Sequence, residues 1–200
     1  MSEMASLRLF TALQLPQEWV EILSDIRAEL DRASGGRLKT VRPELMHLTL
    51  VFLGNQPSDS LNSIGEALST AASEIVPFRL TLGQPDFFGQ PHNIQVIWAG
   101  LEATPPGLQQ LHSAVSVHLA ERGVAFDRKP LVPHITVARG RRPPDRNVSL
   151  QSHAALQKLS LPSGLMLEAK EFVLMESRLD RTGPEYKVVE RFQLPIPPFA

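Results

Sequence analysis

His47-Leu48-Thr49-Leu50 is the stretch that decides the fold, because a near-copy, His134-Ile135-Thr136-Val137, recurs 87 residues later. In an extended strand successive side chains point to opposite faces, so each histidine shares a face with the threonine two positions on. The aliphatic residues between them take the other face. Each motif therefore presents an imidazole and a hydroxyl on one side and a core-forming surface on the other. Two such strands at one cleft could hold a phosphate and move protons around it.

The similarity between the two halves of the chain extends beyond these motifs. The segments that match at an offset of about 87 residues are 7–13 with 94–100, 78–82 with 165–169, and helix-like runs that begin near 16 and 58 with runs near 105 and 148. Self-similarity at one fixed offset indicates two related halves. We therefore expect a single bilobal domain over residues 1–200 with an α+β fold. Each pseudo-symmetric lobe should be a small antiparallel sheet backed by helices, with the active-site groove between the lobes.

Hydrophobic periodicity and chain breakers predict the individual elements. Helices are expected from Pro16 to the residue before Gly35, from Ser58 to Ile75, from Pro105 to the residue before Gly123, and from Val148 to Leu159. Strands are expected at 7–15, 47–53, 78–82, 94–101, 124–128 with 134–138, 165–179 and 186–194, with Gly54 closing the second of them. Residues 38–42 should form a short strand or loop, and the Pro- and Gly-containing segment 83–93 should form a loop.

The bulk composition excludes several classes of protein. Hydrophobic residues make up 42% and charged residues 20% of the chain, which is ordinary for a globular protein. A net charge of −1 gives no global attraction to nucleic acid or to an anionic membrane, so a polyanion must be met by a local patch. The absence of cysteine removes disulfides and thiolate nucleophiles. No secretory signal or long apolar run is evident, so we expect a cytoplasmic protein with no membrane contact and no obligate protein partner, working as a monomer.

Arginines and phenylalanines near the motifs are candidate ligand-binding residues. The arginines lie within the eight positions 139–146, after the second motif strand, and are Arg139, Arg141, Arg142 and Arg146. Such a run is more often a solvated surface than a site, but this one begins where a motif strand ends and could meet a phosphate bidentately. Phe87 and Phe88, in the expected loop, could either stack on a base or cover the core. Phe52, which the 87-residue register sets opposite Arg139, is a third candidate for base stacking.

At these residues the chain resembles the two-histidine phosphoesterase superfamily, which carries paired His-x-[Thr/Ser]-x motifs. Within that superfamily it is most similar to the RNA 2′,3′-cyclic phosphodiesterase group, historically called 2′-5′ RNA ligases. The resemblance spans most of the chain and is carried by segments 7–10, 41–44, 47–50, 52–54, 97–100, 133–139 and 176–179. It implies that His47 and His134 are the catalytic pair. It also implies that Thr49 and Thr136 bind the substrate phosphate and that Arg139 neutralises its charge.

The resemblance further implies the reaction. A 2′,3′-cyclic phosphate end of RNA or of a nucleotide would be hydrolysed to a 2′-phosphate by two imidazoles, without a metal or another cofactor. The expected assignment is His134 as the base on water and His47 as the acid on the departing 3′ oxygen. The reverse reaction would give a minor 2′-5′ RNA ligase activity. The segment 89–93 holds no Lys or Arg, where relatives often carry basic residues, and the arginines at 141, 142 and 146 could compensate.

Two alternatives remain open at the level of sequence. One is a phosphodiesterase of the same superfamily that acts on another substrate, such as an ADP-ribose cyclic phosphate or a 2′-5′ oligoadenylate. The other is a nucleotide-binding module without turnover, although the presence of both histidines and both threonines argues against it. A metal site at His47 and His134 is disfavoured, because no ligand pair has the close spacing usual for zinc.

Overall fold

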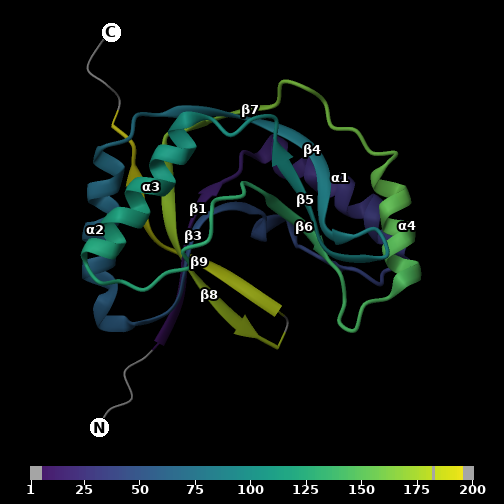
Figure 1. Cartoon of the computed structure of the whole chain (residues 1–200), viewed down its shortest axis with the longest axis horizontal. Coiled ribbons are helices and arrows are strands. Elements are labelled where there is room, and N and C mark those ends of the chain that lie inside the picture. The colour runs from purple at the N-terminus through teal and green to yellow at the C-terminus, as the bar shows by residue number, and fades with distance from the viewer. Residues whose placement is uncertain (1–5, 182, 196–200) are drawn as a thin grey trace.

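The computed structural model describes residues 6–181 and 183–195 and has an α+β architecture (Figure 1). Its strands are β1 (Ser6–Gln14), β2 (Lys39–Thr40), β3 (His47–Pro57), β4 (Phe78–Gln90), β5 (Asn93–Leu101), β6 (Ile135–Arg139), β7 (Met166–Ala169), β8 (Glu171–Asp180) and β9 (Gly183–Gln193). Its α-helices are α1 (Gln17–Ser34), α2 (Leu61–Ser73), α3 (Pro106–Glu121) and α4 (Arg146–Leu156), with single 3₁₀ turns at Pro43–Leu45 and Ser58–Ser60. No described helix combines the length and apolarity needed to cross a bilayer.

The strands form one curled antiparallel sheet whose order reflects the internal repeat. The order is β7-β4-β5-β6-β3-β1-β8-β9, with β2 paired to β6 beside the main path. The two motif strands, β3 and β6, meet at the middle of this order. They are joined by the single registered pair Leu48↔Ile135. The expected α+β fold of two pseudo-symmetric lobes is therefore confirmed, and the lobes are continuous through this join.

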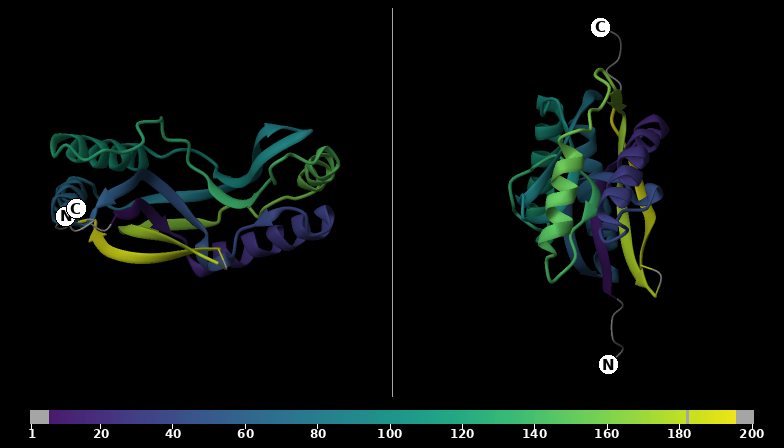
Figure 2. Two further views of the ribbon diagram at one scale, coloured as in Figure 1. Left: turned by 90° about the horizontal axis from the view of Figure 1, so that it is seen from below. Right: turned by 90° about the vertical axis from the view of Figure 1, so that its right-hand side faces the viewer.

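Each lobe is built from interleaved parts of the chain rather than from one sequence half. Helices α2 and α3 pack on each other at one end of the molecule, where α3 contacts β3 and α2 contacts β9. Helices α1 and α4 pack on each other at the other end, where α1 contacts β6 and α4 contacts β5 (Figures 1 and 2). Since α1 precedes β3 in the chain but packs against β6, the two halves exchange helices. This exchange ties the halves to each other around the join.

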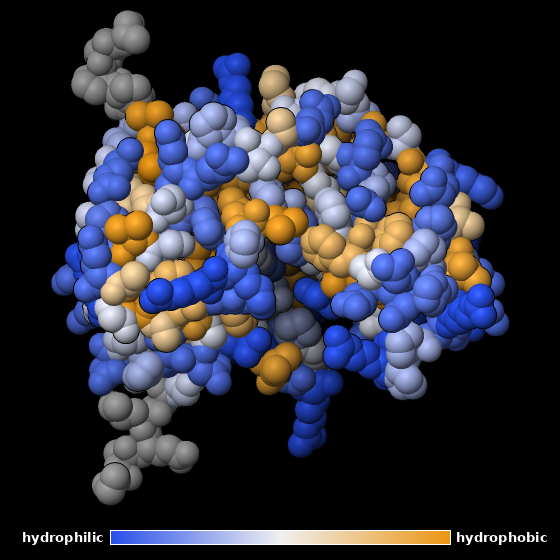
Figure 3. All heavy atoms as spheres, in the orientation of Figure 1, coloured by the Kyte–Doolittle hydropathy of each residue, from blue (hydrophilic) through white to orange (hydrophobic). Residues whose placement is uncertain are grey.

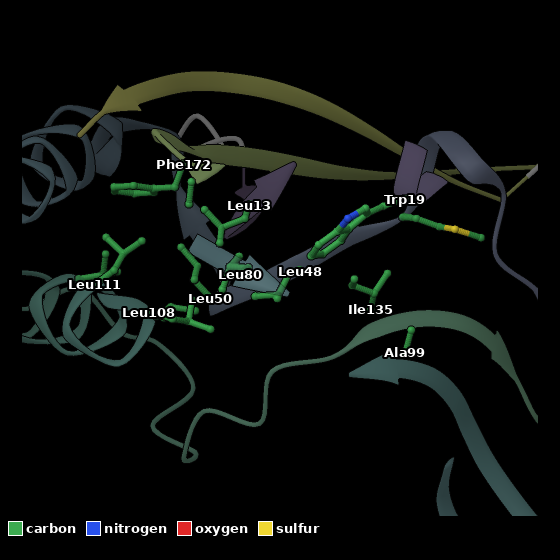
Figure 4. Packing of buried hydrophobic residues seen from close by; sticks show 14 of the residues in the cluster. Leu13, Trp19, Leu48, Leu50, Leu80, Ala99, Leu108, Leu111, Ile135 and Phe172 are labelled. Atoms are coloured by element: carbon green, nitrogen blue, oxygen red, sulfur yellow. The ribbon is translucent and has the colours of Figure 1, made fainter. Parts of the chain in front are cut away.

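The aliphatic face of both motifs lies in the hydrophobic core. Leu48 is 1% exposed and Ile135 is 0% exposed, and they belong to the same buried cluster as Trp19 of α1 (Figure 4). Helix α1 can bury that tryptophan because its apolar positions recur at helical spacing after Pro16, and it ends at Gly35 in the left-handed conformation (φ 60°). The burial of Leu48 and Ile135 leaves the histidines and threonines on the opposite face of the sheet.

The prediction of a loop at 83–93 is wrong. Strand β4 continues to Gln90 and pairs with β5 as a long hairpin, and its register breaks between Leu82 and Pro85. A proline is tolerated inside a strand at such an irregularity, because its missing N–H is not needed there. Gly89 follows with a positive φ of 111°, which a glycine adopts without strain.

Three other boundaries differ from the predictions. Strand β3 does not stop at Gly54, which has a φ of 72° and lies within the strand. The segment 124–134 contains no described strand, and the second motif strand begins only at Ile135. The expected strand 165–179 divides into β7 and β8. The start of β4 pairs directly with β7. The 87-residue offset had matched these same two segments, 78–82 and 165–169, as equivalents in the two halves.

Candidate active site

The two motifs lie side by side at the join of the lobes. Because β3 and β6 run antiparallel through the pair Leu48↔Ile135, His47 comes level with Thr136, and Thr49 comes level with His134. All four polar residues are half-buried, whereas the aliphatic residues between them are buried. Each imidazole therefore shares one face of the sheet with the hydroxyl of the other motif as well as with its own.

A β-bulge at the last residue of each motif adds one more residue to this face. In β6 the register with β5 passes over Val137, so that Val137 and Ala138 are both buried and Arg139 emerges on the pocket side. In β3 the register with β1 passes over Leu50, and Phe52 emerges in the same way. The bulges occupy equivalent positions in the 87-residue repeat. They explain why Arg139 and Phe52 lie in the pocket although strict alternation would turn both away from it.

Each bulge is held by a hydrogen bond from a neighbouring segment. The buried Thr11 hydroxyl accepts a hydrogen bond from the Val51 backbone N–H at 3.1 Å. The Val41 N–H donates to the Val137 carbonyl at 2.8 Å. These contacts satisfy backbone groups that the irregular ladder would otherwise leave unpaired.

Both imidazoles are fixed in the same tautomer. His47 Nδ1 lies 2.7 Å from the Leu45 carbonyl oxygen, and His134 Nδ1 lies 2.7 Å from the Val132 carbonyl oxygen. A carbonyl only accepts hydrogen bonds, so Nδ1 must be the protonated nitrogen in each ring. The Nε2 atoms are left to exchange protons with a ligand, which is the arrangement that an acid–base pair requires.

Aromatic rings flank each histidine. The His47 ring centroid lies 4.8 Å from that of Phe10 and 5.3 Å from that of Tyr186. The His134 centroid lies 5.2 Å from that of Phe88 and 6.3 Å from that of Trp98. These rings and the carbonyl contacts leave each imidazole little freedom to rotate.

The surface above the motifs is a pocket of about 660 Å³ between the β8–β9 hairpin and the motif strands. Figure 3 shows this face of the molecule hollowed near its middle. The basic residues that line the pocket are Arg8, Lys39, Arg42 and Arg139. Among the described residues that line it there is no aspartate or glutamate. A pocket with four cations and no carboxylate favours an anionic ligand.

Two of the four cations are anchored by the protein itself. Arg42 donates to the Pro184 carbonyl at 2.7 Å and lies 3.4 Å from the Glu44 carboxylate. The Arg8 guanidinium lies 4.7 Å from the centroid of the Phe52 ring, over its face. The side chain of Arg139, by contrast, has no hydrogen bond or ion pair with any other residue that the structure describes. Its guanidinium is therefore available to a ligand.

Burial lowers the pKa of the His47 imidazole below its ordinary value. The hydrogen bond to the Leu45 carbonyl opposes this effect, whereas the positive charges of Arg139 and His134 add to it. Burial disfavours the charged form of an imidazole, and nearby cations act in the same direction. The neutral form of His47 is therefore favoured in the ligand-free pocket.

The three candidate base-stacking residues lie in different surroundings. Phe52 lines the pocket. Phe88 packs on Trp98, with 5.0 Å between ring centroids, and on the His134 ring. Phe87 is half-buried against the core and meets the His153 ring at 5.4 Å, so its position agrees with the alternative of core packing.

Several pocket residues were not singled out from the sequence. Phe10 and Arg8 reach the pocket from β1, and Tyr186 reaches it from β9. The alternation of β1 could have set Arg8 and Phe10 on one face, but nothing local indicates that β8 and β9 join the sheet beside β1 and line the same pocket. No group of three or more His, Asp or Glu side chains among the described residues is arranged to hold a metal ion.

The fold and the paired motifs are those of a two-histidine phosphoesterase. A model of the 2′-5′ RNA ligase superfamily matches residues 15–181, and the chain belongs to this superfamily. The chain is 31% identical over 187 residues to the RNA 2′,3′-cyclic phosphodiesterase of Archaeoglobus fulgidus, covering 94% of this chain and 100% of that protein. It is 31% identical over 197 residues to the protein of the same name from Thermus thermophilus, covering 94% and 90%.

Solved structures share the fold. The crystal structure of TT0787 from Thermus thermophilus superposes with a TM-score of 0.76 at 30% identity, covering 94% of this chain and 97% of that chain. Escherichia coli LigT complexed with 3′-AMP superposes with a TM-score of 0.73 at 24% identity, covering 95% and 99%.

Proposed function

We propose that this chain hydrolyses the 2′,3′-cyclic phosphate end of RNA to a 2′-phosphate. The observation that carries the proposal is the pair of Nε2 atoms in a pocket whose described lining residues include four cations and no carboxylate. Relatives at about one-third identity carry the name RNA 2′,3′-cyclic phosphodiesterase, which agrees with this chemistry. LigT, which shares the fold, has been crystallised with 3′-AMP and with phosphate.

The proposed reaction needs one base and one acid. A water molecule attacks phosphorus and gives a proton to a neutral imidazole, while the bond from phosphorus to the 3′ oxygen breaks. The departing 3′ oxygen takes a proton from an imidazolium, which leaves a 2′-phosphomonoester. We assign His134 as the base and His47 as the acid, in line with the family resemblance. The imidazoles need no metal for either transfer, and we propose that the reaction is metal-independent.

The lowered pKa of His47 sets a condition on this assignment. The acid must carry a proton when the substrate is bound, but the ligand-free pocket favours neutral His47. The anionic diester beside the imidazole favours the charged form and so offsets the effect of burial. Substrate binding and protonation of His47 are therefore coupled. The alkaline limb of kcat, which reports the bound enzyme, should lie at higher pH than the alkaline limb of kcat/KM, which reports the free enzyme.

The remaining motif residues bind and neutralise the phosphate in this proposal. The hydroxyls of Thr49 and Thr136 donate to the non-bridging oxygens, and the Arg139 guanidinium meets the charge that grows on them in the transition state. Phe52, with Arg8 over its ring, lines the pocket at the position that is equivalent to Arg139 in the other half of the repeat. We further propose that residues 1–200 form a single bilobal unit that works as a cytoplasmic monomer. Size-exclusion chromatography of the pure protein tests the monomeric state.

The experiment is a product analysis with adenosine 2′,3′-cyclic phosphate, in the presence and absence of EDTA. We expect 2′-AMP in both conditions, and a loss of kcat of about 10²- to 10⁴-fold in His47→Ala and in His134→Ala. His92→Ala is the matched control, because His92 is exposed and does not line the pocket. A 3′-phosphate product would contradict the proposed leaving group, and loss of activity in EDTA would contradict metal independence.

A further inference from the structure

A second hollow lies beside the catalytic pocket. It has a volume of about 780 Å³ and is lined by the segment that joins β6 to α4, the first turn of α4, Ile94 of β5, and Arg37 with Leu38 ahead of β2. Its basic lining residues are Arg37, Arg141, Arg142 and Arg146, and Asp145 is its one acidic lining residue among those described. The first motif and its strand take no part in it. The catalytic proposal uses none of these arginines.

The two hollows are lined by neighbouring residues at the β2–β6 pair. Lys39 of β2 is the registered partner of Arg139 of β6, and both line the catalytic pocket. Arg37, two residues before Lys39, and Arg141, two residues after Arg139, line the second hollow. These two arginines are linked, because Arg141 Nε donates to the Arg37 backbone carbonyl at 2.7 Å. The cations of the second hollow therefore extend the basic surface that begins at the catalytic pocket, two residues further along each segment.

Part of this basic surface is committed to the protein, and part is free to bind a ligand. The Arg37 guanidinium lies 3.3 Å from the Asp145 carboxylate and donates to Gln151, so its charge is largely balanced. The side chains of Arg142 and Arg146 are exposed and have no hydrogen bond or ion pair among the residues that the structure describes. Since one carboxylate is already paired with Arg37, the remaining arginines leave an excess of positive charge in a chain whose net charge is −1.

We propose that this surface, formed by Lys39, Arg141, Arg142 and Arg146, binds the phosphodiester backbone of single-stranded RNA upstream of its cyclic end. The inference rests on the proposed function, because the cyclic phosphate at the 3′ end of the strand must occupy the catalytic pocket. The preceding nucleotides then leave the pocket along β6 toward α4. The preferred substrate class is therefore an oligoribonucleotide rather than a mononucleotide.

The chemistry of the surface suits a backbone rather than a base sequence. Guanidinium groups bind phosphate oxygens through charge and paired hydrogen bonds, and such contacts position a strand without reading its bases. Each phosphate contact with a single strand releases counterions and adds about −0.7 to the slope of log affinity against log salt. A mononucleotide cyclic phosphate has no upstream phosphates, so it cannot gain from these contacts.

The experiment compares adenosine 2′,3′-cyclic phosphate with a six-nucleotide RNA that ends in a 2′,3′-cyclic phosphate, at 50 and 200 mM salt. The variant is Arg142→Gln/Arg146→Gln. We expect its KM for the RNA to rise by about tenfold at 50 mM salt and its salt slope to fall by about 1.4, which corresponds to two lost contacts. Its kcat/KM for the mononucleotide should equal that of the wild type. The substitutions should not unfold the protein, because Arg146 is a cation in the first turn of α4, where a neutral residue is better tolerated.

The matched control removes the same charge elsewhere. Arg79→Gln/Lys158→Gln replaces two exposed cations outside both hollows and should leave the KM for RNA unchanged. An equal rise in KM in this control would overturn the inference, because the effect would then belong to net charge. An unchanged KM for RNA in Arg142→Gln/Arg146→Gln, with the mononucleotide still hydrolysed, would also overturn it and would leave the proposed function intact.

Failure of the proposed function has a separate signature. If the wild type hydrolyses neither substrate, the catalytic proposal falls. Binding of the six-nucleotide RNA, labelled with a fluorophore and ending in a 2′-phosphate, then decides the inference by anisotropy. Weaker binding by the Arg142→Gln/Arg146→Gln variant supports the basic surface as an RNA site, and equal binding contradicts it.

Discussion

Replacement of Arg139 by glutamine should change both the rate and the pH dependence of the reaction. Arg139 emerges into the pocket because of the bulge at Val137, and its side chain makes no hydrogen bond or ion pair with any other described residue. Its guanidinium is thus free to contact the phosphate. Its positive charge also lowers the pKa of His47. The substitution removes the phosphate contact and the charge together, and the two consequences can be measured separately.

The expected loss of rate follows from the contact that is removed. A hydrogen bond to a charged group contributes about 1.5–3 kcal/mol, and each 1.36 kcal/mol is tenfold in rate. Arg139→Gln should therefore lower kcat/KM for adenosine 2′,3′-cyclic phosphate by about 10- to 150-fold. Arg139→Lys is the matched control. It retains the charge but not the planar fork, and it should lose less activity than Arg139→Gln.

The pH profile provides the second readout. Removal of a nearby positive charge favours the protonated form of an imidazole, so the pKa of His47 should rise in Arg139→Gln. The limb of the kcat/KM profile that belongs to His47 should move to higher pH, and Arg139→Lys should leave it in place. Movement of the alkaline limb identifies His47 as the acid, whereas movement of the acidic limb identifies it as the base. If neither limb moves, the electrostatic coupling between Arg139 and His47 is refuted.

Three further predictions concern stability. Thr11→Val keeps the shape of a fully buried side chain but removes the hydroxyl that holds the bulge in β3. In urea, the free energy of unfolding should fall by about 1–3 kcal/mol, and an unchanged midpoint would contradict this role of Thr11. His118 forms hydrogen bonds with Glu74 and Glu121, and these contacts, chiefly the one with Glu74, raise its pKa. The stability that His118 contributes relative to His118→Gln should therefore be complete below pH 6.5 and disappear as the pH rises through the raised pKa. The opposite pH trend in denaturation would count against these contacts. Leu48→Ala should lower the free energy of unfolding by about 2–5 kcal/mol, because Leu48 is 1% exposed at the join of the lobes, and a loss under about 1 kcal/mol would mean that the join is loosely packed.

The repeated motif predicted the centre of the fold because its two faces are chemically distinct. Leu48 and Ile135 bury as alternation requires, and the histidines and threonines gather on the other face. Alternation alone could not predict the position of Arg139. It lies an odd number of residues after Thr136, and the bulge that reverses its direction has no local sequence signal. Its place directly after the motif strand made Arg139 a candidate, and the family resemblance gave it a role in the site.

Tertiary pairing accounts for the predictions that were wrong. Pro85 and Gly89 are ordinary signals of a loop, but pairing with β5 keeps β4 extended through both. The walls of the pocket were also beyond local reasoning. Tyr186 belongs to a hairpin that joins the sheet through β1, far along the chain from either motif. The exchange of α1 and α3 between the lobes leaves no trace in hydrophobic periodicity, because either sheet could bury the same helical face.

The proposed mechanism requires the two imidazoles to act as one unit, and a double-mutant cycle on kcat tests this most directly. The four proteins are the wild type, His47→Ala, His134→Ala and the double variant, assayed with adenosine 2′,3′-cyclic phosphate. If one proton transfer is useless without the other, the double variant should be no slower than the slower single variant, within about a factor of ten. Losses that multiply, or a single variant that retains nearly full activity, would contradict the paired mechanism.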